Sequence, residues 1–177
     1  MKRVVAVVSF ALLLAPIVIG QTAPKVPEPS PDLKKLDYFA GTWHFEGDMK
    51  PSPYWSSGKF SSTDHNEWMP GGFYLVSQAD FRTPLGREKG LAVWGYRNDD
   101  KVYTYHEFDS MGEFLSATGT VQGDTWTWLW DDKVDGKPIK GRYTLKILSP
   151  TSYAFKFETA SSGGQWSTGM EGKATKQ

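Results

Sequence analysis

The stretch Gly90–Gly112, GLAVWGYRNDDKVYTYHEFDSMG, shows an apolar run, a polar turn and a second aromatic run in direct succession. This order is typical of a β-hairpin. We expect its arms near Lys89–Tyr96 and Lys101–Phe108. A four-residue connection, Arg97–Asp100, is predicted between them because this length suits a type I turn.

The length of this connection decides which aromatic rings share a face of the hairpin. With an even number of loop residues, Trp94 and Tyr96 lie on the same side as Tyr103 and Tyr105. The opposite side then carries Val93, Val102, Thr104 and His106. An odd number would mix the two sets, and we favour the even loop.

Further short runs on both sides of the hairpin alternate between apolar and polar residues, with glycine, proline or aspartate between them. The predicted strands are Thr42–Glu46, Lys59–Trp68, Phe73–Phe81, Phe114–Val121, Asp124–Trp130, Ile139–Ile147, Tyr153–Glu158 and Trp166–Ala174. Ahead of them, Asp32 stands as an N-cap before LKKLDYFA, in which Leu33 and Leu36 have helical spacing. This segment predicts one or two turns of helix, ended by Gly41.

About ten antiparallel strands with one short helix predict an all-β protein, either a barrel or a sandwich. Sequential hairpins favour an up-and-down antiparallel barrel. Closure would also remove the exposed sheet edges that an exported sheet without cysteine would otherwise have to protect.

Length and composition indicate a soluble globular protein. The chain has 177 residues, 39% hydrophobic and 23% charged, which suits one domain with one core. Twenty basic and twenty acidic residues cancel, and the sequence pI is near 6.8. This balance argues against nucleic acid or an anionic membrane as a partner.

Residues 1–20 resemble a secretory signal peptide: Lys2 and Arg3 precede a nearly continuous apolar run that ends at Ile19, and Gly20 is small. An uncleaved N-terminal anchor is the alternative. We expect the protein to be exported, periplasmic or secreted, with residues 21–31 as a proline-rich linker and 32–177 as a single barrel domain. A proline-rich ligand for a partner domain is the alternative for 21–31.

Several landmarks, in order along the chain, resemble domain of unknown function family 1579. They are Leu36, Phe39-Ala40-Gly41-Thr42-Trp43, Pro70-Gly71-Gly72-Phe73, Trp94-Gly95-Tyr96-Arg97-Asn98, Lys101-Val102-Tyr103 and Phe108-Asp109-Ser110-Met111-Gly112. The hydrophobic helix leading into Gly-x-Trp also resembles the opening of calycin barrels such as lipocalins and nitrobindin. The resemblance implies a calycin-like β-barrel of about ten strands with room for an interior cavity.

The histidines depart from the haem-binding members of that group. Nitrobindin-like barrels that hold haem use a histidine near the C-terminus, whereas this chain has His44, His65 and His106. We therefore predict no haem and no other cofactor. Three imidazoles could converge at one end of a barrel, but their spacing matches no ligand motif, so no metal site is predicted.

Aromatic stripes give the candidate binding site. Trp126, Trp128 and Trp130 fall on one face of a strand, opposite Thr125 and Thr127. Such rings either line a pocket for a small hydrophobic or aromatic ligand or simply fill the barrel. The proposed ligand-binding residues are Trp94, Tyr96, Tyr103, Tyr105, Trp126 and Trp128. Tyrosine hydroxyls, with His106 or Arg142, would orient a polar end of the ligand.

No catalytic residue is assigned, because the sequence has no nucleophile elbow, no phosphate-binding loop and no His-Glu-x-x-His. Two alternatives to ligand binding stay open. One is an enzyme that uses carboxylates inside the barrel, with Glu67, Glu107, Asp109 and Glu158 as candidates. The other is an envelope interaction protein with a filled barrel. We expect a monomer or weak dimer, with no stable membrane insertion after signal removal.

Overall fold

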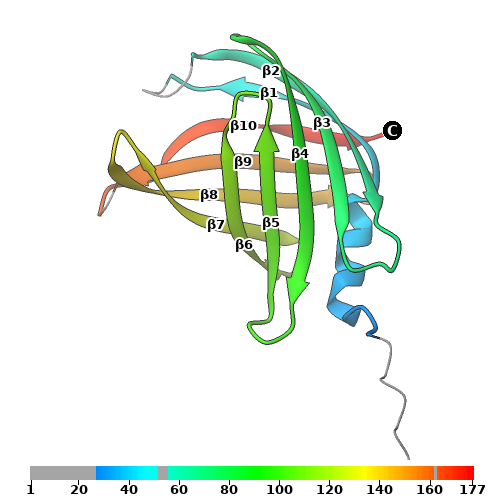
Figure 1. Ribbon diagram of the computed structural model, residues 1–177. Helices are drawn as coiled ribbons and strands as arrows, with labels where there is room; N and C mark the ends of the chain where they lie inside the picture. The colour runs from blue at the N-terminus through cyan, green and yellow to red at the C-terminus, as the bar shows by residue number, and fades with distance from the viewer. Residues whose placement is uncertain (1–26, 52–55, 162) are drawn as a thin grey trace, which may run out of the picture.

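The computed structural model describes residues 27–51, 56–161 and 163–177 and forms a closed barrel of ten antiparallel strands. Each strand pairs with its neighbours in sequence, and β1 pairs with β10 to close the barrel (Figure 1). The all-β, up-and-down barrel predicted from the sequence is therefore confirmed. The predicted signal peptide and most of the linker lie outside the described residues.

The chain enters through the 3₁₀ helix η1 and then forms strands of eight to thirteen residues. Their bounds are η1 Pro31–Phe39, β1 Gly41–Met49, β2 Gly58–Trp68, β3 Leu75–Thr83, β4 Gly86–Arg97, β5 Val102–Asp109, β6 Phe114–Gln122, β7 Thr125–Val134, β8 Lys137–Ser149, β9 Ser152–Ser161 and β10 Ser167–Lys176. Within the described ranges, no helix is both long and apolar enough to cross a membrane.

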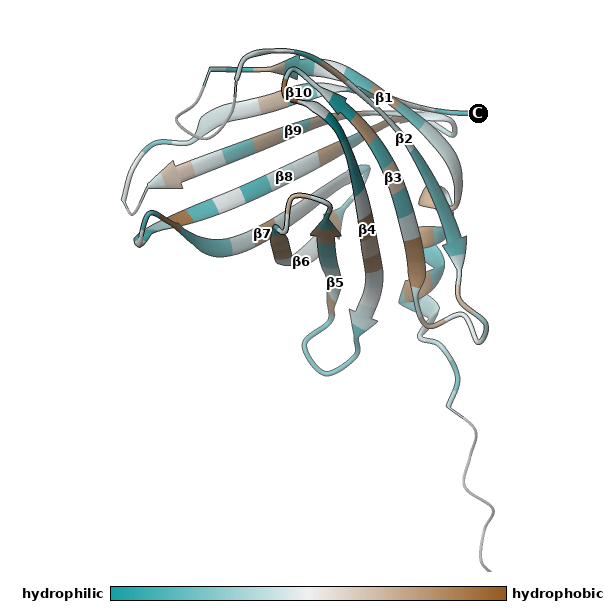
Figure 2. Ribbon diagram, turned by 45° about the horizontal axis from the view of Figure 1, so that its top comes forward, coloured by the Kyte–Doolittle hydropathy of each residue, from teal (hydrophilic) through white to brown (hydrophobic). Residues whose placement is uncertain are grey.

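Alternation along the strands sorts side chains between the interior and the solvent. Figure 2 shows how hydrophobic and hydrophilic residues follow one another along the strands. In β7, Trp126, Trp128 and Trp130 are buried, whereas Leu129 between them is exposed. The interior is therefore built largely from aromatic rings, and the same period-2 pattern that predicted the strands also explains which rings enter the core.

The predicted hairpin has the expected face pairing but a shifted turn. Trp94 lies opposite Tyr105 and Tyr96 opposite Tyr103, so an even loop is confirmed. The last pair is Arg97 with Val102, which makes the connection Asn98–Lys101 instead of Arg97–Asp100. Lys101 adopts a left-handed φ of +55° that returns the chain to β5.

Helix η1 closes one end of the barrel (Figure 1). Leu33, Leu36 and Phe39 are buried against the interior. The predicted N-cap is wrong by two residues: Ser30 caps the helix, and its Oγ accepts a hydrogen bond from the Asp32 backbone N–H. Asp32 instead pairs with Lys35 through its side chain.

Two predicted strands start too early. Phe73 and Tyr74 precede β3, which starts at Leu75. Trp166 precedes β10 and lies at the surface, where the Arg142 guanidinium stands 4.3 Å from its ring centroid. A bulge between Thr168 and Met170 shifts the register of β10, so the simple alternation from Trp166 to Met170 does not hold.

Candidate functional site

An aromatic layer lies directly above η1 and fills one end of the barrel. The ring of Phe39 lies within 5.1 Å of Trp94, 5.2 Å of Trp126 and 5.7 Å of Tyr153, measured between centroids. Tyr103 packs on Trp126 at 4.6 Å. Offset and edge-to-face pairs of this kind stabilise a core beyond the area that they bury, so this end of the barrel is closed by packed rings.

Hydrogen bonds hold the helix against this layer. The indole Nε1 of Trp43 and the amide Nδ2 of Asn66 both donate to the carbonyl oxygen of Phe39, each at 2.8 Å. At the start of η1, the Tyr103 hydroxyl donates to the Asp32 carbonyl at 2.9 Å. The last and first turns of the helix are therefore bonded to β1, β2 and β5, as buried helix ends require.

A cavity of about 190 Å³ remains in the half of the barrel away from η1. It is partly enclosed, and its lining is mainly aromatic and aliphatic. The sixteen lining residues are Phe45, Phe60, Asp64, Phe81, Trp94, Tyr105, Glu107, Leu115, Ala117, Trp128, Trp130, Tyr143, Tyr153, Phe155, Phe157 and Met170. Side chains thus fill part of the lumen and leave a compartment of small-molecule size.

The six predicted ligand-binding residues divide between the two halves of the barrel. Trp94, Tyr105 and Trp128 line the cavity. Tyr96, Tyr103 and Trp126 do not line it. Tyr103 and Trp126 are buried at the end that η1 closes, where Tyr96 packs on Tyr103 at 4.9 Å. The hairpin register could not separate these groups, because helix packing decides which rings are covered.

Two carboxyl groups, Asp64 and Glu107, face the cavity from β2 and β5. Of the four carboxylates that the sequence suggested for an enzyme, Glu107 is the one that lines the cavity. Glu67 is exposed on the outer face, Asp109 accepts from the Met111 backbone N–H in the predicted turn, and Glu158 pairs with Arg142 outside the barrel.

Asp64 was not identified from the sequence, although a signal for it exists. The sequence pattern places Phe60 and Trp68 on one face of the strand, and Asp64 lies midway between them with the same parity. A charged residue in phase with the buried face of a strand is the informative exception to the alternation.

Neutral hydroxyl groups are the hydrogen-bond partners of these carboxyl groups. Ser62 Oγ donates to Asp64 Oδ1, and the Tyr105 hydroxyl donates to Glu107 Oε2 at 2.8 Å. Ser62 is buried, whereas Asp64 and Glu107 are of intermediate exposure, as expected for side chains that face a cavity.

Burial controls the protonation of the site. It raises the pKa of Asp64 to about 7, against the lowering effect of the Ser62 hydrogen bond, and the nearby Glu107 raises it further. Burial also raises the pKa of Glu107, which the Tyr105 hydroxyl partly offsets. The pKa values of Tyr105 and Tyr143 lie well above the usual range for the same reason, so both hydroxyls stay neutral.

Two indole N–H groups beside the cavity lack acceptors. Trp94 and Trp128 are buried, and neither Nε1 atom has a hydrogen-bond partner among the described residues. Buried donors without partners are uncommon in folded proteins. Both rings belong to the cavity wall.

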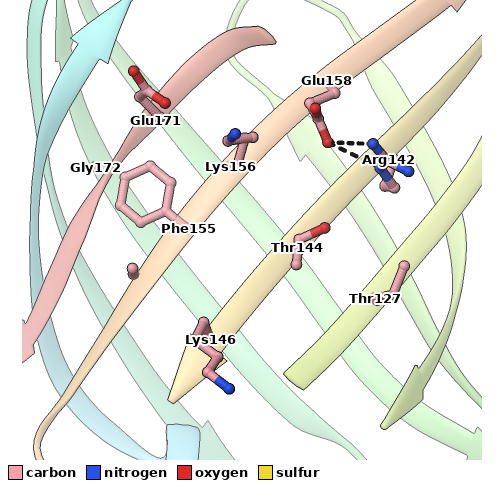
Figure 3. A pocket seen from close by; sticks show the side chains of 10 residues that line it. Thr127, Arg142, Thr144, Lys146, Phe155, Lys156, Glu158, Glu171 and Gly172 are labelled. Carbon is pink, nitrogen blue, oxygen red and sulfur yellow. Dashed lines mark hydrogen bonds and ion pairs between the residues drawn. The ribbon is translucent and has the colours of Figure 1, made fainter. Parts of the chain in front are cut away.

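A second, shallow depression lies outside the barrel over β7–β10, where Figure 3 shows the Arg142–Glu158 pair among the residues that line it. Four of its five charged side chains have ion-pair partners, Lys156 being the exception among the described residues: Arg142 bonds Glu158 at 2.7 Å, Lys146 bonds Asp124, and Glu171 bonds Lys50 at 2.8 Å. Because ion pairs satisfy most of its charge, the interior cavity is the better candidate site.

The three histidines lie on the outer face, His44 and His65 on the paired strands β1 and β2 and His106 on β5. His65 approaches Thr42, His44 approaches Thr63, and His106 approaches Ser116. In the described part of the chain, no group of three or more histidine, cysteine, aspartate or glutamate residues is arranged to hold a metal ion. His106 and Arg142, considered above for orienting a ligand, both face away from the cavity.

The sequence profile of the family described as "Protein of unknown function (DUF1579)" matches residues 28–176. The chain belongs to this family. The match runs from just before η1 to the end of β10, so the DUF1579 region includes the helix and all ten strands. No curated protein matches the chain.

The fold of this DUF1579 protein is also found in a solved structure. Rv2717c from M. tuberculosis has a TM-score of 0.57 at 12% identity, over 85% of this chain and 99% of that chain. A DUF3598 protein of unknown function from Nostoc punctiforme covers 84% of this chain and 100% of its own at 7% identity, but its TM-score is 0.23. The first likeness shows a shared fold.

Proposed function

We propose that this DUF1579 protein binds a small hydrophobic or aromatic molecule inside the barrel. The observation that carries the proposal is the interior cavity of about 190 Å³, lined by aromatic and aliphatic side chains with two carboxyl groups among them. Binding sites for small molecules commonly combine an apolar wall with a few polar groups that fix orientation.

The cavity size limits the ligand. An apolar cavity of about 150 Å³ engineered in another protein binds benzene. A compartment of about 190 Å³ therefore suits a molecule with one ring or two small fused rings. Burial of such a ring against Trp94, Trp128 and Tyr143 would supply most of the binding free energy.

Titration with phenol, indole and 2-naphthol tests this proposal. We expect saturable shifts of the Trp94 and Trp128 indole N–H resonances in proton–nitrogen NMR spectra, because both rings line the cavity. Ala117→Leu should weaken binding at least tenfold, since Ala117 is buried and the larger side chain would occupy the cavity.

Thr118→Leu is the matched control, because Thr118 is adjacent on β6 but exposed. This variant should bind as the unmodified protein does. Circular dichroism establishes that both variants are folded. Saturation by none of the three compounds, or equal binding by the Ala117→Leu variant, would contradict an interior site.

An enzyme is the second candidate, favoured by the two interior carboxyl groups with raised pKa values. A carboxyl group with a pKa near 7 can both donate and accept a proton at neutral pH. Prolonged NMR observation of each bound compound distinguishes the two functions: binding alone leaves its spectrum unchanged, whereas catalysis produces new resonances.

We also propose export, supported by the charged start, apolar run and small residues of positions 1–20. The protein would then act in the periplasm or outside the cell as a monomer or weak dimer. The mass of the protein recovered from an exporting host tests cleavage near Gly20, since an uncleaved chain would retain all 177 residues.

A further inference from the structure

The cavity contains two acidic side chains and no basic side chain. Its sixteen lining residues include Asp64 and Glu107, and none of them is lysine, arginine or histidine. An ionised carboxylate in such surroundings is costly unless it is paired with an opposite charge. This imbalance is the starting point for identifying the ligand.

Several carboxylates on the outer face of the barrel have basic partners. Asp80 pairs with Arg87, Asp48 with Lys59 at 2.7 Å, and Asp131 with Lys140 at 2.8 Å. Each of these three carboxylates is therefore neutralised by a cation at the surface. The interior pair is distinguished by its position, since the alternation of β2 and β5 turns Asp64 and Glu107 away from every cation on the surface.

The hydrogen bonds of the interior pair leave room for a ligand. Ser62 and Tyr105 each satisfy one oxygen of one carboxyl group. The other oxygens, Asp64 Oδ2 and Glu107 Oε1, accept no hydrogen bond from the residues that the structure describes. Two free acceptor atoms thus face a compartment in which an N–H donor could lie.

Aromatic faces beside these carboxyl groups favour the same kind of donor. Tyr105 lies 5.1 Å from Trp94 and 5.7 Å from Trp128, measured between ring centroids, and Tyr143 completes the wall. Tryptophan and tyrosine rings attract cations through their π faces, more strongly where water is excluded. The carboxyl groups and the aromatic rings therefore both favour an organic cation as the ligand.

A metal ion fits this donor set poorly. Hard cations such as Ca²⁺ take about six to eight oxygen ligands, and Mg²⁺ keeps several waters. The cavity offers two carboxyl groups among apolar rings, and the described residues contain no ligand cluster of three or more. An organic cation needs only one or two carboxylates and can bury its apolar part.

We propose that the ligand of the cavity is an arylalkylamine, whose ammonium group is held by Asp64 and Glu107 and whose ring packs between Trp94, Trp128 and Tyr143. This inference rests on the proposed binding function and specifies its ligand class. The ammonium group would supply the positive charge that the cavity lacks, and the orientation of the ligand would be fixed at its charged end.

Three compounds with one ring and a two-carbon side chain test the charge requirement at pH 8: phenethylamine, 2-phenylethanol and phenylacetate. The first is a cation at this pH, because alkylammonium groups have a pKa of about 10. We expect calorimetry to give phenethylamine at least tenfold tighter binding than 2-phenylethanol, and no measurable binding of phenylacetate.

Isosteric variants assign the effect to the two carboxyl groups. Asp64→Asn and Glu107→Gln should each weaken phenethylamine binding at least tenfold, with 2-phenylethanol binding changed by less than threefold. Glu67→Gln removes a carboxylate from the exposed face of the same strand as Asp64 and should change neither. Loss of 2-phenylethanol binding as well would mean that a variant disturbs the cavity itself and would contradict the assigned role.

The pH dependence gives an independent measurement. The titratable groups that act on Asp64 are Glu107, Tyr105, Tyr143 and Tyr153, and the three tyrosines stay neutral over this range. Protonation of Asp64 removes the charge that binds the amine, so phenethylamine affinity should fall at least fivefold from pH 8 to pH 5.5. Binding of 2-phenylethanol should stay constant.

The outcomes separate the inference from the function on which it rests. If 2-phenylethanol binds as tightly as phenethylamine, the ligand class is wrong and the interior binding site stands. If none of the three compounds binds while indole or phenol does, the amine is again excluded. If no compound in either series binds, the proposed function itself is contradicted.

Discussion

At the scale of single residues, Asp64 is the least expected feature of the barrel. Most interior positions carry aromatic or small side chains, but this one carries a carboxyl group whose main partner is a serine hydroxyl. A carboxylate there lowers stability when it is ionised, because burial penalises the charged form. A titratable group whose pKa is strongly shifted by burial is more typical of a functional site than of core packing.

The first stability prediction concerns the pH dependence that Asp64 causes. Its pKa rises from the usual 3.8 to about 7 in the folded protein, so the folded state binds the proton more tightly than the unfolded state. The resulting stability is fully present below the unfolded value and is lost as the pH rises through about 7. Asp64→Asn should raise the free energy of unfolding at pH 8 by about 1–3 kcal/mol.

Urea unfolding at pH 5 and pH 8 measures this effect. The difference between the two pH values should be smaller in the Asp64→Asn variant than in the unmodified protein. Glu67→Gln, on the outer face of β2, serves as the control and should keep the original difference. Equal pH profiles of the Asp64→Asn variant and the unmodified protein would show that Asp64 titrates as an exposed carboxylate.

At the scale of elements, glycines in β6 and β8 make room for the rings of β7. Gly119 lies opposite Trp128, and Gly141 lies opposite Trp130. A Cβ atom built at Gly119 would stand 2.5 Å from Cε3 of Trp128, and one at Gly141 would overlap the Trp130 ring. Each indole therefore lies over a strand position that only glycine can occupy.

Gly141→Ala tests this arrangement of strands. The new methyl group must displace the Trp130 ring, so we expect the free energy of unfolding to fall by about 1–3 kcal/mol, as for overpacking of other cores. The same substitution in a Trp130→Ala background should cost less, because the overlapping ring is gone. Additive costs in this double-mutant cycle would contradict the steric explanation.

The strands also show how far sequence patterns reach. Alternation identified the inward rings of β7 and the even register of the β4–β5 hairpin. It could not locate the turn to the residue, because Lys101 adopts a left-handed conformation that other residues favour more. It also failed at Trp166, since the bulge before Met170 depends on pairing with β9.

At the scale of the whole molecule, closure of the sheet and the packing of η1 against the core stabilise a barrel that has no disulfides. Pairing of β1 with β10 leaves no exposed sheet edge, and the sequence contains no cysteine. Helix η1 completes the core by burying Leu33, Leu36 and Phe39. The barrel is thus stabilised by ring packing and backbone hydrogen bonds.

Leu36→Ala tests how much helix η1 contributes to the stability of the barrel. Leu36 is fully buried, so its truncation should lower the free energy of unfolding by about 2–5 kcal/mol through lost burial and a residual cavity. Lys34→Ala on the exposed side of η1 should change it by less than about 0.5 kcal/mol. Chemical denaturation measures both, and similar values for the two variants would mean that η1 does not belong to the folding unit.

The sequence by itself determined the all-β class, the order of the strands, the single short helix before them and the family, because strand alternation and turn residues are local signals. Only the tertiary structure decided which rings lie under η1 and which line a cavity. It also decided that Asp64 and Glu107 line the same cavity. These two residues are 43 positions apart in sequence and on strands that are not neighbours in the sheet, so their encounter follows from curvature and closure of the barrel, which no local pattern records.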